Sequence, residues 1–340
     1  MLYGILAATT ALLLAALLAA LFRGPGLRVR AFDRRRQRPV PLLGGAAVVL
    51  ATCAVAGTCT WTGVAPLGGG VGRLLVAGAG VALLGLVADV WRLRVRVLVA
   101  GTAIAAACVV PYDETGVPAG MLAVGWTVFV ALAFRSLDHA DGLAGTVGVV
   151  TAFGVAACAA ADLMDGLAVL LLSVLAAALT GFLMHNWHPA RIGLGACGSL
   201  FAGFLLASSA VFTRAGYGTW SSSGVLFALT AVGSADVALV VLSRRTAKRS
   251  LLRAGPDHLA HRLRRLGLTP QGATVLLGLG AFSGVLVGVL AHTGWADEEN
   301  VLWVAGGALL VVLLLLRVPV YGARRVVSSQ VRAQLRVRSG

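Results

Sequence analysis

The chain has 340 residues, of which 59% are hydrophobic and 12% are charged, and its mean hydropathy is +0.91. A soluble domain usually carries about a quarter charged residues, so this chain has too little polar surface for a water-soluble globule. The composition excludes soluble enzymes, disulfide-rich secreted domains and disordered chains, and it predicts a multi-pass membrane protein. The five cysteines lie in apolar stretches without metal-finger spacing, which indicates small core residues.

Eleven apolar runs are long enough to cross the hydrocarbon core of a bilayer, which takes roughly 20 residues each. They predict an all-α polytopic membrane protein with about eleven transmembrane helices, as a single domain over residues 1–320 followed by a basic tail at 321–340. The runs lie at residues 2–22, 41–63, 73–90, 95–111, 118–134, 142–161, 164–184, 193–213, 222–242, 272–292 and 300–320.

The basic residues predict the orientation of these helices. Of the 28 Lys and Arg residues, 26 fall in alternate loops, in the tail or at one helix end, and only Arg73 and Arg214 fall on the other side. Because cytoplasmic loops are rich in Lys and Arg, the N-terminus is expected outside and the C-terminus in the cytoplasm. The loops are 23–40, 91–96, 135–141, 185–192 and 243–271, and Arg317 is the helix-end residue.

The net charge of +15 therefore mostly reflects the basic cytoplasmic loops, and it also attracts anionic membrane lipids. No nucleic-acid partner is expected. The first apolar run has no basic segment before it, so it is predicted to be an uncleaved helix rather than a signal peptide. The Gly-, Ala-, Val-, Leu- and Arg-rich composition is typical of a GC-rich bacterial genome, so the expected location is the inner (plasma) membrane of a bacterium.

Six of the thirteen acidic residues fall at the predicted cytoplasmic ends of helices or in cytoplasmic loops. A carboxylate at the membrane boundary is costly, so it usually marks a site or a pairing partner. These six predict an active-site-like cleft on the cytoplasmic face that takes an anion and a divalent metal ion. They are Asp33, Asp89, Asp138, Asp141, Asp236 and Asp257.

The same face carries a series of motifs. Residues 38–45 read R-P-V-P-L-L-G-G, residues 85–89 read G-L-V-A-D, residues 138–145 read D-H-A-D-G-L-A-G, and residues 256–263 read P-D-H-L-A-H-R-L. Between the last two lie N-W-H-P-A-R-I at 186–192 and G-A-C-G-S-L at 195–200. From about residue 33 to 270, this order resembles the polyprenyl-phosphate N-acetylhexosamine-1-phosphate transferase family; D-x-x-D-G-L-A-G and H-L-x-H-R-L are specific in combination.

The resemblance implies transfer of a HexNAc-1-phosphate group from a UDP-sugar to polyprenyl phosphate, with release of UMP, to make a lipid intermediate of a cell wall or surface polysaccharide. Such a transfer depends on positioning and charge neutralisation, with Mg²⁺ held by carboxylates. The resemblance implies catalytic roles for Asp89, Asp138 and Asp141. It implies substrate or phosphate contacts for Asn186, Asp236, His258, His261 and Arg262. A homodimer or a complex with a partner glycosyltransferase is compatible with this interpretation.

The chain departs from the family pattern where the metal and the phosphates would bind. Ala88 stands where the family has the first of two adjacent aspartates, and Ala196 stands at the metal-binding aspartate of Gly-Asp-x-Gly-Ser. Arg135 and Leu132 replace two asparagines ahead of the D-x-x-D pair, and Ala260 thins the histidine triplet. The metal ligands are therefore left undefined, and Arg135 itself is a candidate to take the place of the cation.

Structural alternatives exist for each of these side chains. Asp138 and Asp141 share a face if a helix runs through them, or they cap the helix predicted at 142–161. Asp89 either keeps half of an acidic pair or forms a salt bridge with one of three nearby arginines (Arg92, Arg94 and Arg96).

For the remaining polar residues, Asp236 either lies near the site or pairs with an arginine inside the membrane. His258 and His261, spaced i and i+3, could hold a phosphate, whereas a zinc site would need more ligands. His185 and His188 are expected to be interfacial.

Two functions therefore follow from the sequence. The first is a membrane sugar-1-phosphate transferase that uses a UDP-sugar, polyprenyl phosphate and Mg²⁺. The second is a catalytically degenerate relative that binds lipid phosphate or a partner enzyme, because two family aspartates are Ala88 and Ala196. Loss of ligands that stabilise a transition state costs roughly tenfold in rate for each 1.36 kcal/mol. A transporter is disfavoured by the motifs.

Overall fold

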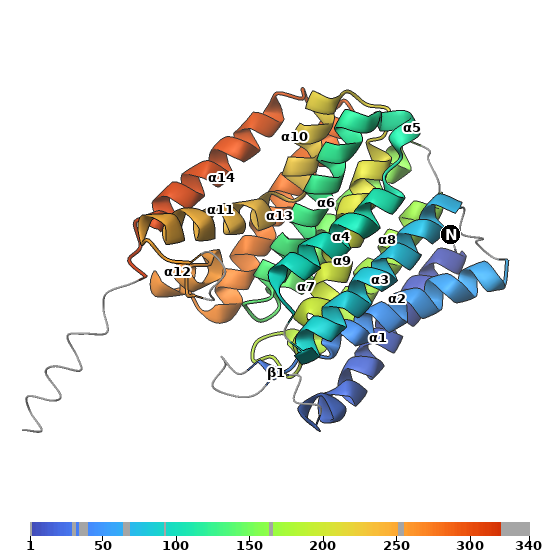
Figure 1. Cartoon of the computed structure of the whole chain (residues 1–340), viewed down its shortest axis with the longest axis horizontal. Helices are drawn as coiled ribbons and strands as arrows, with labels where there is room; N and C mark the ends of the chain where they lie inside the picture. Colours follow the sequence, from blue (N-terminus) through green and yellow to red (C-terminus); the bar gives the residue numbers. More distant parts are fainter. Residues whose placement is uncertain are drawn as a thin grey trace, which may run out of the picture.

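The structure of the protein is a computed structural model that describes residues 2–28, 32–33, 40–63, 69–91, 93–162, 166–250 and 255–320. The described chain is almost entirely helical, as predicted, apart from one short antiparallel pair, β1 (Phe32–Asp33) and β2 (Val40–Pro41). The tail at 321–340, the side chain of Asp33, and Arg92 lie outside the part that is described. Figure 1 shows the long helices running side by side.

Each of the eleven predicted apolar runs coincides with a helical element. In chain order they are α1 (Leu2–Arg28), α2 (Gly44–Trp61), α3 (Gly69–Trp91), α4 (Val95–Val109), α6 (Val117–Leu137), α7 (Leu143–Ala161), α8 (Gly166–Asn186), α9 (Gly195–Thr213), the pair α10 (Thr219–Leu229) and α11 (Ala231–Thr246), α13 (Pro270–His292) and α14 (Asn300–Leu316). Two short helices, α5 (Tyr112–Thr115) and α12 (Leu259–Arg265), lie between them.

The number of membrane spans is lower than eleven by the criteria of length and hydropathy. Within the described residues, eight helices are long and apolar enough to cross a bilayer, and a ninth span results if α10 and α11 are taken together. The α4 and α14 helices have only 15 and 17 residues. The all-α polytopic class is therefore confirmed, while eleven spans and the orientation remain predictions.

The α9 helix occupies the centre of the bundle. Its side chains are buried almost all the way round, as expected for a helix that is apolar on every face. The α2 helix approaches it so closely that a Cβ atom on Gly45 would lie 2.1 Å from the backbone nitrogen of Gly198. Only glycine allows this contact, and it brings the beginning of α2 against the beginning of α9.

The ends of several helices meet at one pole of the bundle, which we call the site end. It contains the beginnings of α2, α7, α9 and α13 and the last residues of α3, α6 and α8, joined by the hydrogen bonds described below. Arg135, Arg191 and the three arginines of α12 lie at this end, whereas Arg214 follows α9 at the opposite end. The predicted separation of basic residues therefore corresponds to the two ends of the bundle.

The run at 222–242 differs from the prediction because it is not one straight helix. It breaks at Thr230, and α10 and α11 meet at an angle of 82°. In Figure 1, α11 runs across the direction of α10 toward α12. The Leu229 carbonyl at the break accepts a hydrogen bond from the Thr151 hydroxyl of α7 at 3.2 Å, which satisfies a polar group exposed by the break.

Candidate active site

The first turn of α9 holds two of the predicted catalytic carboxylates. Asp89, in the last turn of α3, accepts hydrogen bonds from the Ala196 and Cys197 N–H groups at 2.9 and 3.0 Å. Asp138, just after α6, accepts one from the Gly195 N–H at 2.9 Å. The positive end of the α9 dipole favours both negative charges. Two side chains that bind three consecutive amides are near neighbours, so Asp89 and Asp138 lie together at the beginning of α9.

The backbone at Gly195 makes this arrangement possible. Its φ of +67° lies in the left-handed region that favours glycine, and a Cβ atom there would lie 2.6 Å from the nearer carboxylate oxygen of Asp89. The alternative salt bridge from Asp89 to Arg94 or Arg96 is not found among the described residues, where the carboxylate instead accepts the backbone amides of α9.

No helix runs through Asp138 and Asp141, so the alternative in which they share a helix face does not apply. The α6 helix ends at Leu137, and α7 begins at Leu143 with Gly142 as its N-cap and without a capping side chain. Asp141 instead accepts the Ala190 N–H at 3.1 Å and contacts His188 Nδ1 at 2.7 Å. The two carboxylates therefore fix two different parts of the segment that joins α8 to α9.

Asn186 lies beneath this surface and is only 3% exposed. Its amide Nδ2 donates to the Ile192 carbonyl at 2.7 Å, and its Oδ1 accepts the Gly142 N–H at 2.9 Å. The side chain thereby braces two loops of the site end against each other. Its predicted contact with substrate would require these bonds to be exchanged.

A histidine cluster lies beside the carboxylates, and α12 supplies half of it. His139 stacks on His258 with ring centroids 4.0 Å apart, and His261 meets the edge of His139 at 4.9 Å. Burial lowers the pKa of His139 to about 3 and that of His261 to about 4, with the neighbouring His258 adding to both shifts. Both imidazoles are therefore neutral at pH 7.

Asp236 is fully buried under this cluster. It accepts hydrogen bonds from the Ser136 hydroxyl and the Leu259 N–H, both at 2.9 Å, and its Oδ2 lies 2.9 Å from His258 Nδ1. The alternative pairing of Asp236 with an arginine is therefore wrong, because histidine and a hydroxyl surround it. Asp236 joins α11 to α12 and holds the histidine cluster in place.

Arg262 lies inside the protein, where it is 2% exposed. Its guanidinium donates to the Leu315 and Val318 carbonyls at 2.7 and 2.8 Å, and to the Ser243 hydroxyl. Asp257, which is also fully buried, pairs with Arg244 at 3.0 Å. These bonds fasten α12 to α11 and to the end of α14, so a phosphate could reach Arg262 only by displacing protein acceptors.

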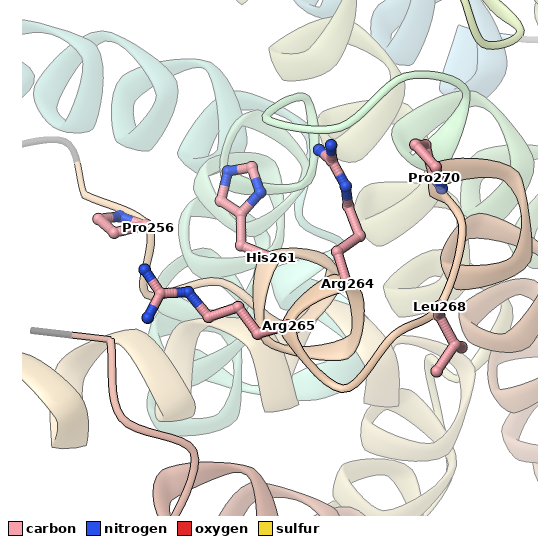
Figure 2. A pocket seen from close by; sticks show the side chains of 6 residues that line it. All are labelled: Pro256, His261, Arg264, Arg265, Leu268 and Pro270. Carbon is pink, nitrogen blue, oxygen red and sulfur yellow. The ribbon is translucent and has the colours of Figure 1, made fainter. Parts of the chain in front are cut away.

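Sequence reasoning missed two exposed arginines of α12. With His261 they line an open hollow that also includes Pro256, Leu268 and Pro270. Figure 2 shows that His261 and Arg264 rise on the same side of α12, while Arg265 is directed toward Pro256. The H-L-x-H-R-L motif drew attention to Arg262, yet the helical period turns Arg264 and Arg265 toward the hollow and Arg262 inward.

The residues present fit Mg²⁺ poorly. This hard ion prefers near-octahedral oxygen ligands, usually one or two carboxylates together with substrate phosphates. Both oxygens of Asp89 already accept backbone N–H groups, and one of these groups belongs to Ala196, where the family would supply a ligand. Arg135 adds positive charge close to Asp89. We therefore derive no chemical step through Mg²⁺.

Fold and site together define a multi-pass, all-helical membrane protein with a polar site at one end of its bundle. The model of glycosyl transferase family 4 matches residues 72–214. A Streptomyces coelicolor protein that carries the provisional name of a glycosyltransferase is 66% identical over 95% of this chain and 80% of its own length.

Two further relatives have more specific names. The decaprenyl-phosphate N-acetylglucosaminephosphotransferase of Mycolicibacterium smegmatis is 29% identical over 74% of this chain and 70% of its own length. The phospho-N-acetylmuramoyl-pentapeptide-transferase of Desulforamulus reducens is 32% identical over 52% of this chain and 54% of its own. The chain belongs to the polyprenyl-phosphate N-acetylhexosamine-1-phosphate transferase family, as its motifs indicated.

Proposed function

We propose that this protein transfers a HexNAc-1-phosphate group from a UDP-sugar to polyprenyl phosphate, at a site end that faces the cytoplasm of a bacterium. An oxygen of polyprenyl phosphate attacks the sugar-linked phosphorus, the bond from that phosphorus to the UMP oxygen breaks, and UMP leaves. The products are UMP and a lipid diphosphate sugar. The observation that supports this proposal is the meeting of Asp89, Asp138 and Asp141 with the basic α12 helix at one end of a membrane bundle.

The residues of the chain would contribute mainly charge and position. Arg264 and Arg265 at the hollow are suited to bind phosphate oxygens, and His261 beside them can donate one hydrogen bond while neutral. Asp138 and Asp141 hold the loops of the site end in a fixed arrangement, which keeps reacting groups oriented. A flexible loop could not maintain such positions.

A second candidate is supported by the environment of Asp89. Its two oxygens are satisfied by helix amides, and Ala88 and Ala196 supply no further carboxylate. This arrangement suits a protein that keeps the lipid-phosphate site and has lost most of the transfer chemistry. Such a protein would bind polyprenyl phosphate, or a partner glycosyltransferase, without turnover.

The test is transfer of radiolabelled sugar phosphate from UDP-GlcNAc to decaprenyl or undecaprenyl phosphate by the purified full-length protein. It is run with and without EDTA, and binding of the lipid phosphate is measured in parallel. Transfer supports the first candidate, and binding without transfer supports the second. With either readout, Arg264→Ala should weaken the lipid or nucleotide interaction, whereas Arg73→Ala at the opposite end should not. Absence of both binding and transfer contradicts both candidates.

A further inference from the structure

Three side chains from separate parts of the sequence meet beside the carboxylates of the site end. His139 lies in the turn between α6 and α7, Asp236 lies in α11, and His258 is the N-cap of α12. Each offers one ligand atom, and these atoms all lie within 4.8 Å of one another. Nothing in the reaction proposed above uses this group of atoms.

His139 presents a lone pair that has no partner. Its Nδ1 lies 2.7 Å from the Ser136 carbonyl, and a carbonyl can only accept, so Nδ1 carries the proton. Nε2 of the neutral ring is then an acceptor, and it is buried without a hydrogen-bond partner among the described residues. A buried acceptor left unsatisfied costs free energy, so a ligand that accepts this lone pair would stabilise the site.

His258 lies close enough to Asp236 for both side chains to bind one ion. Its Nδ1 lies 2.9 Å from a carboxylate oxygen of Asp236, which also accepts the Ser136 hydroxyl. A metal ion that displaces the shared proton would have His258 Nδ1 and this carboxylate oxygen as two of its ligands, while the Ser136 hydroxyl supports the carboxylate from outside. The Ser136 carbonyl in turn fixes the tautomer of His139 in which Nε2 can act as a ligand.

We propose that His139, His258 and Asp236 form a binding site for a borderline divalent transition metal ion of the zinc class. Two imidazole nitrogens and one carboxylate are ligands that suit Zn²⁺. Mg²⁺ prefers oxygen ligands and binds imidazole nitrogen poorly. Three protein ligands with an open fourth position are a common arrangement for Zn²⁺, so a water molecule could complete the coordination and His261 would remain at the hollow. The sequence alone offered two histidines, and the fold adds the ligands that such a site requires.

Binding would change the cluster in a defined way. Two nitrogens on one tetrahedral zinc ion, with bonds of about 2.0–2.1 Å, are roughly 3.3 Å apart. The ligand atoms now lie within 4.8 Å, and the rings of His139 and His258 are stacked with an interplanar angle of 18°. The metal would therefore unstack the rings and draw the α6–α7 turn, α11 and α12 together, which fixes the wall of the hollow.

The experiment uses purified full-length protein in detergent that is stripped with a chelator and titrated with Co²⁺, then with Zn²⁺. We expect one metal ion per chain, visible absorption typical of low-symmetry Co²⁺, loss of that absorption on adding Zn²⁺, and a higher Tm with Zn²⁺. Excess Mg²⁺ should not compete. No substrate is present, so failure of the proposed transferase activity would leave this result unaffected.

Variants assign the ligands. His139→Ala and His258→Gln should weaken Zn²⁺ binding at least 100-fold, and Ser136→Ala should weaken it roughly 10- to 100-fold because it removes a supporting hydrogen bond. His185→Gln, a histidine in α8 outside the cluster, is the matched control and should bind like the wild type. The proposal is overturned if the wild-type protein binds no Zn²⁺, or if folded His139 and His258 variants bind as tightly as the control.

Discussion

At the scale of single residues, Asp89 has a structural role that its motif did not reveal. Its carboxylate satisfies two amides at the first turn of α9, in a region where α3 and α9 are in close contact. The free energy of this interaction includes both the hydrogen bonds and the favourable position of a negative charge at a helix N-terminus. Asp89 therefore supports the fold whether or not it acts in chemistry.

We expect Asp89→Asn to lower the stability of the folded protein by about 1–3 kcal/mol, because the amide NH₂ group cannot accept the second N–H. The change should be seen as a lower Tm of the purified protein in detergent. Asp113→Asn, which alters an exposed carboxylate in α5, is the control and should leave Tm nearly unchanged. Equal Tm values for the two variants would contradict the capping role.

The two alanines in the motifs permit a second prediction. Ala88→Asp combined with Ala196→Asp should strengthen Mg²⁺ binding, because it adds two oxygen ligands next to Asp89. Both positions are almost fully buried, at 5% and 2% exposed, so the same double variant should also have a lower Tm without metal. Metal affinity is measured by titration, and sugar-phosphate transfer is measured with and without EDTA. The same assays are repeated on the double variant with the further change Arg135→Asn, which removes the nearby positive charge.

The second candidate, a relative that has lost the transfer chemistry, predicts that the wild-type protein binds Mg²⁺ weakly and shows little or no transfer in that assay, whereas the first candidate predicts transfer. Ala88→Asn combined with Ala196→Asn matches the double variant in size without its charge and should gain less Mg²⁺ affinity. Strong turnover by the wild type that is abolished by EDTA would show that other residues hold the metal, and the interpretation of Ala88 and Ala196 as losses would be wrong.

At the scale of helices, a second polar cluster ties together the ends opposite the site. Arg214 is 4% exposed, contacts His292 Nδ1 at 3.0 Å and lies over the ring of Tyr217 at 3.9 Å. His292 and Tyr217 both contact Asp162 at the end of α7. The cluster joins α7, α9 and α13 where apolar packing ends.

Arg214→Met should lower the stability by about 3–5 kcal/mol, because it removes the cation that a buried polar network surrounds. The expected readout is a large decrease in Tm or loss of folded protein. Arg73→Met changes an exposed arginine at the same end and should behave like the wild type. A small effect at Arg214 would mean that the network contributes little to helix association.

At the scale of the whole molecule, the two ends of the helix bundle differ in their content of basic residues. The basic loops connect at the site end, and Arg214 lies at the other. Because the positive charges of a membrane protein concentrate on the cytoplasmic side, the site end is predicted to face the cytoplasm. This orientation would expose the hollow beside α12 to soluble nucleotide sugars.

Reporter fusions test this orientation. A reporter placed after residue 68 should be outside, and one placed after residue 250 should be in the cytoplasm. The two fusion points are predicted to lie on opposite sides of the membrane. Equal signals from a reporter that is active on one side only would therefore contradict the predicted topology. A fusion after residue 116, beyond α5, should match the outside result and serves as a control.

The sequence by itself determined the class of the protein, the position of every long helix and the family. Apolar runs of about 20 residues form helices in a bilayer because a helix pairs the backbone polar groups within the segment itself. Motif order then carried the family resemblance, which the comparisons confirm. Conversely, the sequence did not predict the break at Thr230. Both halves of the run are apolar, and hydrophobic periodicity does not indicate where a helix bends.

Only the tertiary structure decided what each polar side chain does. Asn186 and Arg262 looked like substrate ligands, yet their hydrogen bonds connect loops and helices inside the protein. His139 gained its significance from His258 and Asp236, which lie about a hundred residues further along the chain. Spacing along a helix can place two residues on one face, but contacts between distant segments depend on how the helices pack, and a single sequence does not record that packing.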